Sequence, residues 1–270
     1  NILVLGLDRR PYEGEACTRA DTFFIVSLDA YQNTASVLSF PRDMYIDIPD
    51  GANGTYLQRI NTTTVFGCGD KYPGGGPGLA KDTLKLNFGI DINYYAIIDF
   101  VGFEQLINSL GGIDFDVPET VVVNSLQFYP GMQHMDGERA LTYARLRPDG
   151  DFKRIERQQR VMIEVAKKAL GLGLLNDPVG TYDQYKNTID TDIPDGALPG
   201  LGLLAKEIGL DTVKTYSMAN YCPEPNVECK PALTSFTTSE GAAVQLPVWP
   251  LSFKIINQAM PDPGIQGDAA

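Results

Sequence analysis

Residues 22–40, TFFIVSLDAYQNTASVLSF, hold two runs of β-branched and aromatic residues on either side of a polar connection. Runs of this kind are typical of buried strands, and the connection Asp29–Thr34 has the length of a hairpin loop. Upstream, the apolar run Ile2–Leu5 stops at Gly6 and predicts a further strand. The chain is therefore expected to begin a sheet with strands at residues 2–5, 22–28 and 35–40.

Strand and helix patterns then alternate along the chain. Residues 94–98, YYAII, predict another strand, and Gly74–Gly78 is expected to be a loop that leads into a helix. Apolar residues at helical spacing, together with caps such as Asp136, predict helices at residues 79–87, 103–110, 138–143 and 155–170. Interleaved strands and helices favour a layered α/β sheet with helices on both faces.

No internal repeat and no linker divides the chain, so residues 1–270 are expected to form a single domain. Its motif-bearing core is residues 1–215, and residues 216–270 form a C-terminal extension that packs on this core without an assigned role. No run of 18 or more apolar residues is present, so no segment is expected to span a bilayer. Because the chain begins without Met and inside a strand, the absence of a signal or anchor does not indicate a cytosolic origin.

The charge balance excludes a general nucleic-acid binder. With 22 Lys and Arg against 34 Asp and Glu, the formal net charge of −12 repels a phosphate backbone at long range. The arginines are nevertheless unevenly placed, because all of them lie within residues 1–160. Guanidinium groups gathered in one part of an acidic chain indicate a local anion site.

The four cysteines favour an oxidising compartment. Cys222 and Cys229 flank a turn-rich stretch and could close a short loop, which leaves Cys17 with Cys68. The alternative is four reduced thiols in a cytosolic protein. Their spacing does not resemble a zinc ribbon, and the chain has a single histidine, His134, so no zinc site is expected.

Two familiar enzyme classes are disfavoured. A catalytic triad or a Cys-His pair would have to use His134, which is expected to be an exposed loop residue in a chain that has no nucleophile-elbow pattern. The run Gly74–Gly78 is followed by Lys81, but it lacks the Gly-Lys-Ser/Thr arrangement of a phosphate-binding loop. It is better interpreted as a flexible surface loop.

Arginine and aspartate occur together where the predicted strands begin or end, which is where open α/β sheets place ligand sites. Asp8-Arg9-Arg10 follows the first strand, Arg19-Ala20-Asp21 precedes the second, and Pro41-Arg42-Asp43 follows the third. Asp8 and Asp21 could supply oxygen ligands to a partly hydrated magnesium ion.

A fourth group surrounds the start of the longest predicted helix. Arg154 and Gln158 are four residues apart and Arg157 is three from Arg154, so all three could point toward one ligand. The whole group is Arg145, Arg147, Arg154, Arg157 and Gln158. Guanidinium forks bind phosphate oxygens in pairs, so the four groups together favour a diphosphate site. The alternative is ordinary surface ion pairs, each worth about 0–1 kcal/mol.

These segments resemble the LytR-CpsA-Psr family of bacterial cell-wall glycopolymer ligases. The resemblance follows the family order from residue 1 to about residue 170, and it thins beyond about residue 215. It is carried by residues 2–10 (ILVLGLDRR), 19–22 (RADT), 38–43 (LSFPRD), 59–61 (RIN), 110–118 (LGGIDFDVP), 141–147 (LTYARLR) and 149–158 (DGDFKRIERQ).

The resemblance implies a three-layer α/β/α fold with a central mixed sheet and an apolar tunnel for a lipid chain. It implies a Mg²⁺-dependent phosphotransferase that moves a glycopolymer from a polyprenyl-pyrophosphate carrier to a sugar hydroxyl of peptidoglycan and forms a phosphodiester, with pyrophosphatase activity as a side reaction. The protein is then expected to be a monomer at the outer face of the bacterial cytoplasmic membrane, held by an N-terminal anchor that precedes this chain.

The resemblance also implies roles for particular residues. Asp8 and Asp21 are expected to hold the magnesium. Arg42, Asp43, Arg145 and Arg147 are the expected catalytic residues. Asp43 is the first candidate for the base that accepts the hydroxyl proton, and the alternative is that it orients Arg42 through an ion pair. The pyrophosphate is expected to be bound by Arg10, Arg19, Arg42, Arg145, Arg147, Arg154, Arg157 and Gln158.

Two other functions are compatible with the same residues. One is a polyprenyl-pyrophosphate phosphatase, in which water takes the place of the glycan acceptor. The other is a non-catalytic module that binds lipid or glycopolymer, which the complete set of charged positions disfavours.

Overall fold

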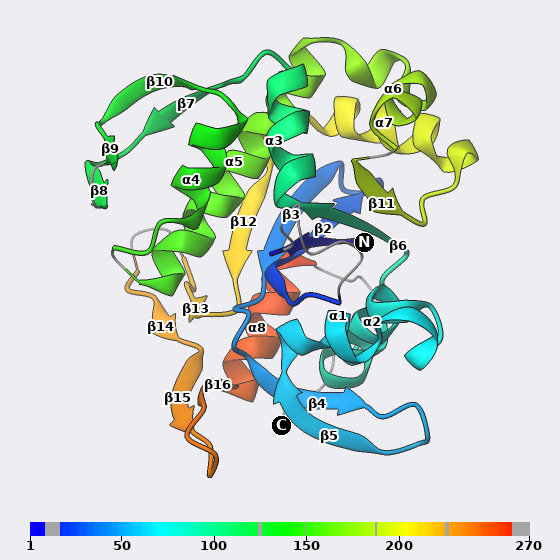
Figure 1. Ribbon diagram of the computed structural model, residues 1–270, viewed down its shortest axis with the longest axis vertical. Helices are drawn as coiled ribbons and strands as arrows, with labels where there is room; N and C mark the ends of the chain where they lie inside the picture. The colour runs from blue at the N-terminus through cyan, green and yellow to red at the C-terminus, as the bar shows by residue number, and fades with distance from the viewer. Residues whose placement is uncertain (9–16, 124–125, 149, 187, 225–226, 261–270) are drawn as a thin grey trace.

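The computed structural model describes residues 1–8, 17–123, 126–148, 150–186, 188–224 and 227–260. Its centre is a mixed sheet with the strand order β11-β6-β1-β2-β3-β12-β13-β14 (Figure 1). The strands of this sheet are β1 (Ile2–Leu7), β2 (Ala20–Asp29), β3 (Thr34–Ser39), β6 (Tyr94–Asp99), β11 (Ile189–Thr191), β12 (Lys214–Ser217), β13 (Asn220–Tyr221) and β14 (Lys230–Pro231).

Strand pairing confirms the strands predicted at the start of the chain. β2 and β3 form the expected antiparallel hairpin, in which Ile25 lies opposite Leu38. β1 pairs antiparallel with β2 and parallel with β6, so that Leu5 lies between Phe23 and Ile97. The sheet is therefore mixed, and β1 and β2 are both interior strands, which agrees with their apolar sequences.

Helices cover both faces of this sheet (Figure 1). The α-helices are α1 (Thr63–Phe66), α2 (Gly75–Phe88), α3 (Phe100–Ser109), α4 (Gly137–Arg145), α5 (Asp151–Gly171), α6 (Pro178–Tyr185), α7 (Leu198–Ile208) and α8 (Trp249–Ala259). Short 3₁₀ turns are η1 (Ile60–Thr62), η2 (Gly69–Lys71), η3 (Leu174–Asn176), η4 (Asp195–Ala197) and η5 (Leu210–Thr212). Asp136 caps α4 as expected, because its side chain accepts a hydrogen bond from the Arg139 amide at 2.9 Å.

Alternation along β2 separates the two layers of packing. Phe23 and Ile25 belong to a buried cluster that includes residues of α2 and α8, whereas Phe24 packs with Val37 and with Ile155 of α5. Successive side chains of a strand point to opposite faces, so these contacts place α5 on one side of the sheet and α2 and α8 on the other. The three-layer α/β/α fold expected from the sequence is confirmed.

Four two-stranded ribbons surround the main sheet. They pair β4 (Tyr45–Pro49) with β5 (Thr55–Arg59), β7 (Ile113–Val117) with β10 (Gly131–Met135), β8 (Val121–Val123) with β9 (Leu126–Phe128), and β15 (Leu233–Thr237) with β16 (Ala243–Pro247). His134 lies on β10, so the prediction of a loop there is wrong, although its side chain is 59% exposed as expected. It contacts Asp114 on the neighbouring strand at 2.8 Å.

The glycine run that the sequence predicts as a loop is largely helical. Only Gly74 precedes α2, where it adopts a left-handed conformation, and Gly75–Gly78 form the first turn of the helix. A Cβ on Gly76 would lie 2.8 Å from Cα of Thr64 in α1. Glycine is therefore required here because two helices approach closely, a reason that the local sequence does not reveal.

The C-terminal segment joins the main body of the fold. The boundary expected at residue 215 falls inside β12, which pairs with β3, and β13 and β14 extend the same sheet. Ile255 and Ile256 of α8 lie in the same buried cluster as Leu3 and Leu5 of β1. Among the described residues, no helix is both long enough and apolar enough to cross a bilayer.

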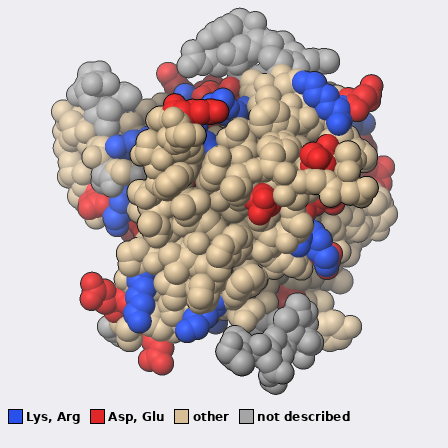
Figure 2. Space-filling model, turned by 90° about the horizontal axis from the view of Figure 1, so that it is seen from below, with Lys and Arg blue, Asp and Glu red and all other residues tan. Residues whose placement is uncertain are grey.

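One face of the molecule carries its charged side chains in a dispersed form. Figure 2 shows acidic and basic side chains interspersed on one face, with a broad area of uncharged residues between them. This face holds no basic patch within the part of the chain that the structure describes.

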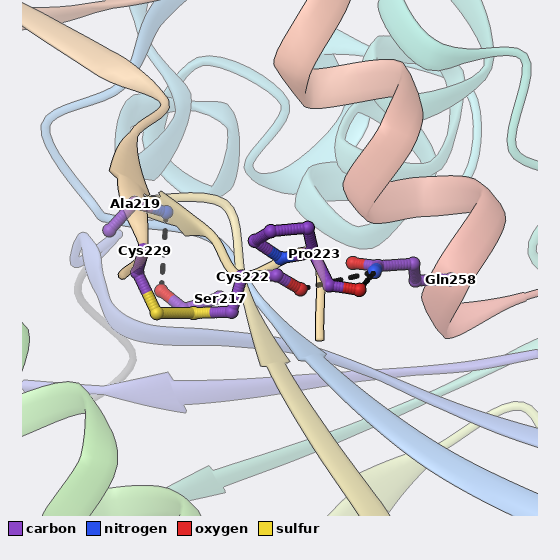
Figure 3. The surroundings of a disulfide bond; sticks show 6 residues. All are labelled: Ser217, Ala219, Cys222, Pro223, Cys229 and Gln258. Atoms are coloured by element: carbon purple, nitrogen blue, oxygen red, sulfur yellow. Dashed lines mark hydrogen bonds between the residues drawn. A yellow bond between two sulfur atoms is a disulfide. The ribbon is translucent and has the colours of Figure 1, made fainter. Parts of the chain in front are cut away.

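Two disulfides connect all four cysteines, as expected for an oxidising compartment. Cys222–Cys229 closes the end of the β13–β14 hairpin (Figure 3). The Gln258 side chain of α8 donates hydrogen bonds to the carbonyls of Cys222 and Pro223 at 3.1 and 3.4 Å. This disulfide therefore holds a loop against the C-terminal helix.

The second disulfide lies just before the start of β2. Cys17–Cys68 joins segments that are 51 residues apart and ties the residues just before β2 to the end of α1. The same connection is reinforced by Thr64, whose hydroxyl donates to the Thr18 carbonyl at 2.7 Å. Both the disulfide at Cys17 and the hydrogen bond to Thr18 hold the segment directly before Arg19, a residue that the sequence predicts to lie near a ligand.

Candidate active site

A cavity of about 510 Å³ lies between β1, β2 and β6 on one side and α3, α4 and α5 on the other. Most of its wall is apolar. Phe24 faces this cavity because β2 alternates, while Phe23 faces the opposite core. The apolar wall includes Val4, Phe24, Ile97, Phe100, Phe103, Leu106, Leu141, Val161, Met162 and Val165.

The predicted charged residues are gathered at the same cavity. β1 ends opposite the start of β2, and β3 runs antiparallel to β2, so Asp8, Asp21 and Arg42 meet at one edge of the sheet. Helices α4 and α5 bring the other members to this edge. Seven of the expected site residues line the cavity: Asp8, Asp21, Arg42, Arg145, Arg147, Arg154 and Gln158.

Three guanidinium groups converge on the Asp21 carboxylate. Arg42 Nη1 lies 2.6 Å from Oδ1, and Arg147 Nη2 and Arg154 Nη1 lie 3.8 and 4.0 Å from Oδ2. Arg145 is held differently, with its guanidinium carbon 4.2 Å from the centre of the Phe100 ring. These contacts fix the cations at one end of an otherwise apolar space.

The charges at the cavity leave an excess of cation. Four arginines line it, against the carboxylates of Asp8, Asp21 and Asp99. Asp99 also caps α3 by accepting a hydrogen bond from the Gly102 amide at 2.8 Å. An apolar cavity with guanidinium forks at one end is complementary to an amphiphile that has an anionic phosphate head.

A second pocket of about 330 Å³ shares Asp8, Asp21 and Arg42 with the first. It contains Arg19 and Asp43, which the sequence also assigns to the site. The Asp43 carboxylate bridges two arginines, with Oδ2 at 3.5 Å from Arg42 Nε and Oδ1 at 3.3 Å from Arg59 Nε. Both carboxylate oxygens thus face cations, which agrees with a role of Asp43 in orienting Arg42. Its other predicted role, as the base that accepts the hydroxyl proton, stays a prediction.

One of the predicted residues that the structure describes, Arg157, does not join this group. The Arg157 side chain is buried but lines neither pocket, because its Nη2 donates to the Leu146 carbonyl at 2.6 Å. Arg154 and Gln158 line the cavity and Arg157 does not, so a role of Arg157 at the same ligand stays a prediction. Arg10 lies outside the described residues.

Sequence reasoning gave no role to three residues of the second pocket, namely Thr18, Arg59 and Asn61. Arg59 and Asn61 belong to the segment RIN, so their presence in a resemblance motif was the available signal. Thr18 carried no signal of its own beyond its position next to Arg19.

Asp8 and Asp21, which line both pockets, could hold a magnesium ion whose remaining ligands come from the substrate. No group of three or more His, Cys, Asp or Glu side chains among the described residues could hold a metal by itself. Asp8 Oδ1 is nevertheless buried without a hydrogen-bond partner in the described part of the chain. Mg²⁺ is commonly bound by one or two carboxylates together with phosphate oxygens and water, so Asp8 and Asp21 suffice as protein ligands.

Comparison with known proteins places this fold and site in a family. The model of the LytR_cpsA_psr family matches residues 1–242. The chain belongs to the LytR-CpsA-Psr family.

Relatives and solved structures agree with this membership. The chain of this LytR-CpsA-Psr protein is 31% identical over 253 residues to the regulatory protein MsrR of Staphylococcus aureus, covering 91% of this chain and 70% of the relative. It is 29% identical over 196 residues to the polyisoprenyl-teichoic acid–peptidoglycan teichoic acid transferase TagU of Enterococcus faecalis, covering 72% and 61%. The crystal structure of B. subtilis TagV has the same fold, with a TM-score of 0.73, 23% identity and 96% coverage of both chains.

Proposed function

We propose that this protein transfers a glycopolymer from a polyprenyl-pyrophosphate carrier to a sugar hydroxyl of peptidoglycan, forming a phosphodiester. The observation that carries the proposal is the apolar cavity with four arginines at one end, which matches a lipid tail joined to a pyrophosphate. The transferase name of TagU, a relative at 29% identity, supports the same reaction class.

The arginines bind the pyrophosphate and stabilise its charge during transfer. Arg42, Arg147 and Arg154 already converge on Asp21, so they need little reorganisation when phosphate oxygens enter. Arg145 and Gln158 border the same space, and Arg19 and Arg10 complete the proposed pyrophosphate-binding set. Arg157 positions this set indirectly, because it donates a hydrogen bond to the Leu146 carbonyl between α4 and α5.

Asp8 and Asp21 are the residues that would hold Mg²⁺. When bound, this ion supplies positive charge beside the pyrophosphate oxygens. The buried Asp8 Oδ1 supports this role, because an anionic oxygen without a hydrogen bond is unfavourable inside a protein unless a cation is present.

The reaction is a substitution at the phosphorus that carries the glycopolymer. The acceptor hydroxyl oxygen forms a new bond to this phosphorus, and the bond from phosphorus to the bridging oxygen breaks. The bridging oxygen leaves with its electron pair as part of polyprenyl phosphate, and the hydroxyl proton passes to a carboxylate, for which Asp43 is the candidate. When water is the acceptor, the same step gives the pyrophosphatase side reaction.

The proposed location is the outer face of the bacterial cytoplasmic membrane. The two disulfides support an oxidising compartment outside the cytoplasm. A polyprenyl carrier is itself a membrane lipid, so an N-terminal anchor that precedes this chain would keep the protein, acting as a monomer, close to its donor.

The test is a transfer assay with a polyprenyl-pyrophosphate disaccharide as donor and peptidoglycan oligomers as acceptor. Arg145→Ala and Arg147→Ala are each expected to lower the rate by about 100-fold or more, since each removes a cation placed to stabilise developing charge. Arg160→Ala is the matched control on α5. The Arg160 guanidinium lies away from the cavity and donates a hydrogen bond of 2.7 Å to the Asp116 carbonyl. Wild-type rates in both site variants would contradict the proposal, and release of the disaccharide phosphate into water alone would identify a phosphatase.

A further inference from the structure

The second pocket is polar, unlike the cavity that it adjoins. It is lined by none of the apolar wall residues of the larger cavity. Its lining is Thr18 and Asn61 together with the charged residues Asp8, Arg19, Asp21, Arg42, Asp43 and Arg59. Among the described residues, the two linings share Asp8, Asp21 and Arg42. A ligand in the second pocket would therefore reach the pyrophosphate from the side opposite the apolar cavity, in which the lipid chain is proposed to lie.

Asn61 is a buried polar residue whose side-chain oxygen has no partner. The residue is 4% exposed, and its Oδ1 makes no hydrogen bond within the part of the chain that the structure describes. Thr18 Oγ1, in the same pocket, is also buried without one. Buried polar atoms are nearly always hydrogen-bonded in native proteins, so two such atoms in one pocket indicate that a ligand completes them.

The neighbours of Asn61 show that the turn itself does not need this side chain. The hydroxyls of Thr62 and Thr63 donate to the carbonyls of Arg59 and Ile60 at 2.7 and 2.8 Å. Thr64 Oγ1 lies within hydrogen-bond distance of the carbonyls of Thr18, at 2.7 Å, and Asn61, at 3.3 Å. The three threonines close the turn internally and hold Thr18 and Asn61 beside each other.

The direction of the reaction assigns a ligand to this pocket. In phosphoryl transfer the attacking and leaving oxygens lie roughly in line on opposite sides of phosphorus. The leaving oxygen belongs to the polyprenyl phosphate, whose chain extends into the apolar cavity under the proposed function. The attacking hydroxyl must therefore arrive from the polar side, where the Asn61 amide and the Thr18 hydroxyl, beside charged groups that also form hydrogen bonds, suit a sugar.

We propose that the second pocket binds the acceptor sugar and that Asn61 Oδ1 accepts a hydrogen bond from one of its hydroxyls. Thr18 provides a second hydrogen bond to the same sugar, and Arg59 keeps Asp43 at the edge of the pocket. This inference rests on the proposed function, because it takes the transfer reaction as given and assigns the site of its acceptor.

Steady-state kinetics of Asn61→Ala test the assignment. The KM for a soluble peptidoglycan disaccharide is expected to rise about tenfold, in keeping with the loss of one neutral hydrogen bond, while the KM for the polyprenyl-pyrophosphate donor stays at the wild-type value. Thr63→Val is the matched control, because it removes a hydroxyl from the same turn that bonds to the Ile60 carbonyl and lines neither pocket. An increase in the donor KM instead would place the donor sugar in this pocket and overturn the inference, as would an unchanged acceptor KM.

A binding measurement separates this inference from the proposed function. The same disaccharide is titrated calorimetrically into wild type and Asn61→Ala in the presence of Mg²⁺ and a short prenyl pyrophosphate, where no transfer occurs. About tenfold weaker binding to the variant supports the acceptor site even if the wild-type protein transfers nothing. Equal binding to the two proteins, alongside wild-type transfer activity, overturns the acceptor site alone.

Discussion

Arg154 occupies an environment in which a cation is unusual, because its side chain is only 2% exposed. Burial of a guanidinium carries a desolvation penalty, and buried ion pairs are often no more stable than an apolar replacement of similar volume. Its placement beside Asp21, at the polar end of the cavity, therefore indicates a role in binding an anion rather than in stabilising the fold. Arg157, three residues later on α5, is also buried, and its Nη2 donates a hydrogen bond to the Leu146 backbone carbonyl.

This contrast gives a residue-scale prediction. Arg154→Met is expected to weaken donor binding at least tenfold, the size of a lost charge-assisted hydrogen bond, while the free energy of unfolding changes by less than about 1 kcal/mol. Asp21 keeps Arg42 at 2.6 Å in this variant, so its carboxylate stays paired with a cation. Isothermal titration with a short prenyl pyrophosphate and denaturant unfolding measure the two quantities.

Arg157→Met is the matched variant on the same helix. It leaves the Leu146 carbonyl without its donor and is expected to lower the free energy of unfolding by about 1–3 kcal/mol, with a smaller effect on donor affinity. If Arg157→Met instead weakens donor binding as much as Arg154→Met does, the separation of their roles is wrong.

The same pair shows what the sequence can predict about single residues. Arg154 and Gln158 are four apart on a helix, so a shared direction follows from helical geometry alone. The direction of Arg157 depends on the Leu146 carbonyl at the corner between α4 and α5, and that corner is a tertiary feature. Asn61 was recognisable only as part of a motif, because a buried oxygen without a partner cannot be seen in a sequence.

At the scale of elements, the loop before β2 owes its position to a disulfide. Cys17–Cys68 anchors the segment that carries Thr18 and Arg19 into the second pocket, whereas Cys222–Cys229 closes a hairpin end beside α8. The first link spans 51 residues and the second spans 7. Chain entropy then gives stabilisations of about 4 and about 2 kcal/mol.

Replacing each pair by serine distinguishes an active-site tether from a purely structural link. Cys17→Ser with Cys68→Ser is expected to lower the free energy of unfolding by about 4 kcal/mol and also to lower the transfer rate, because Arg19 loses its anchored position. Cys222→Ser with Cys229→Ser is expected to lower the free energy of unfolding by about 2 kcal/mol and to leave the transfer rate at the wild-type value. Assays at a temperature where both variants are folded check this, and equal rates in the two variants would contradict it.

Elements were predictable where a local pattern decides them. The hairpin of β2 and β3 and the strand β6 followed from runs of β-branched and aromatic residues, and Asp136 marked the start of α4. The start of α2 was not predictable, because Gly75–Gly78 read as a loop and become helical through the close approach of α1. Tertiary contact overrides local propensity in such a segment.

At the scale of the whole molecule, an acidic chain forms a cationic site by gathering a few arginines at one place. The net charge of the chain is −12, whereas four arginines line the cavity at the edge of the sheet where β1, β2, β3, α4 and α5 come together. A net charge of −12 gives no long-range attraction for an anionic donor, so the arginines act on it at close range. Burial of the lipid part of the donor in the apolar cavity then contributes binding free energy that does not depend on charge.

The length of the cavity gives the last prediction. Val165 lies eleven residues beyond Arg154 on α5, which is about 16 Å along the helix axis, and both residues line the same cavity. Val165→Trp is expected to shorten the apolar space without touching the arginines, so a long polyprenyl donor loses at least tenfold in kcat/KM while a donor with a short prenyl chain keeps its wild-type value. Val165→Ala is the control that enlarges the space and is expected to accept both donors. A melting temperature for Val165→Trp near that of the wild type shows that the fold is intact. If Val165→Trp uses long and short donors in the wild-type ratio, the lipid chain does not occupy this cavity.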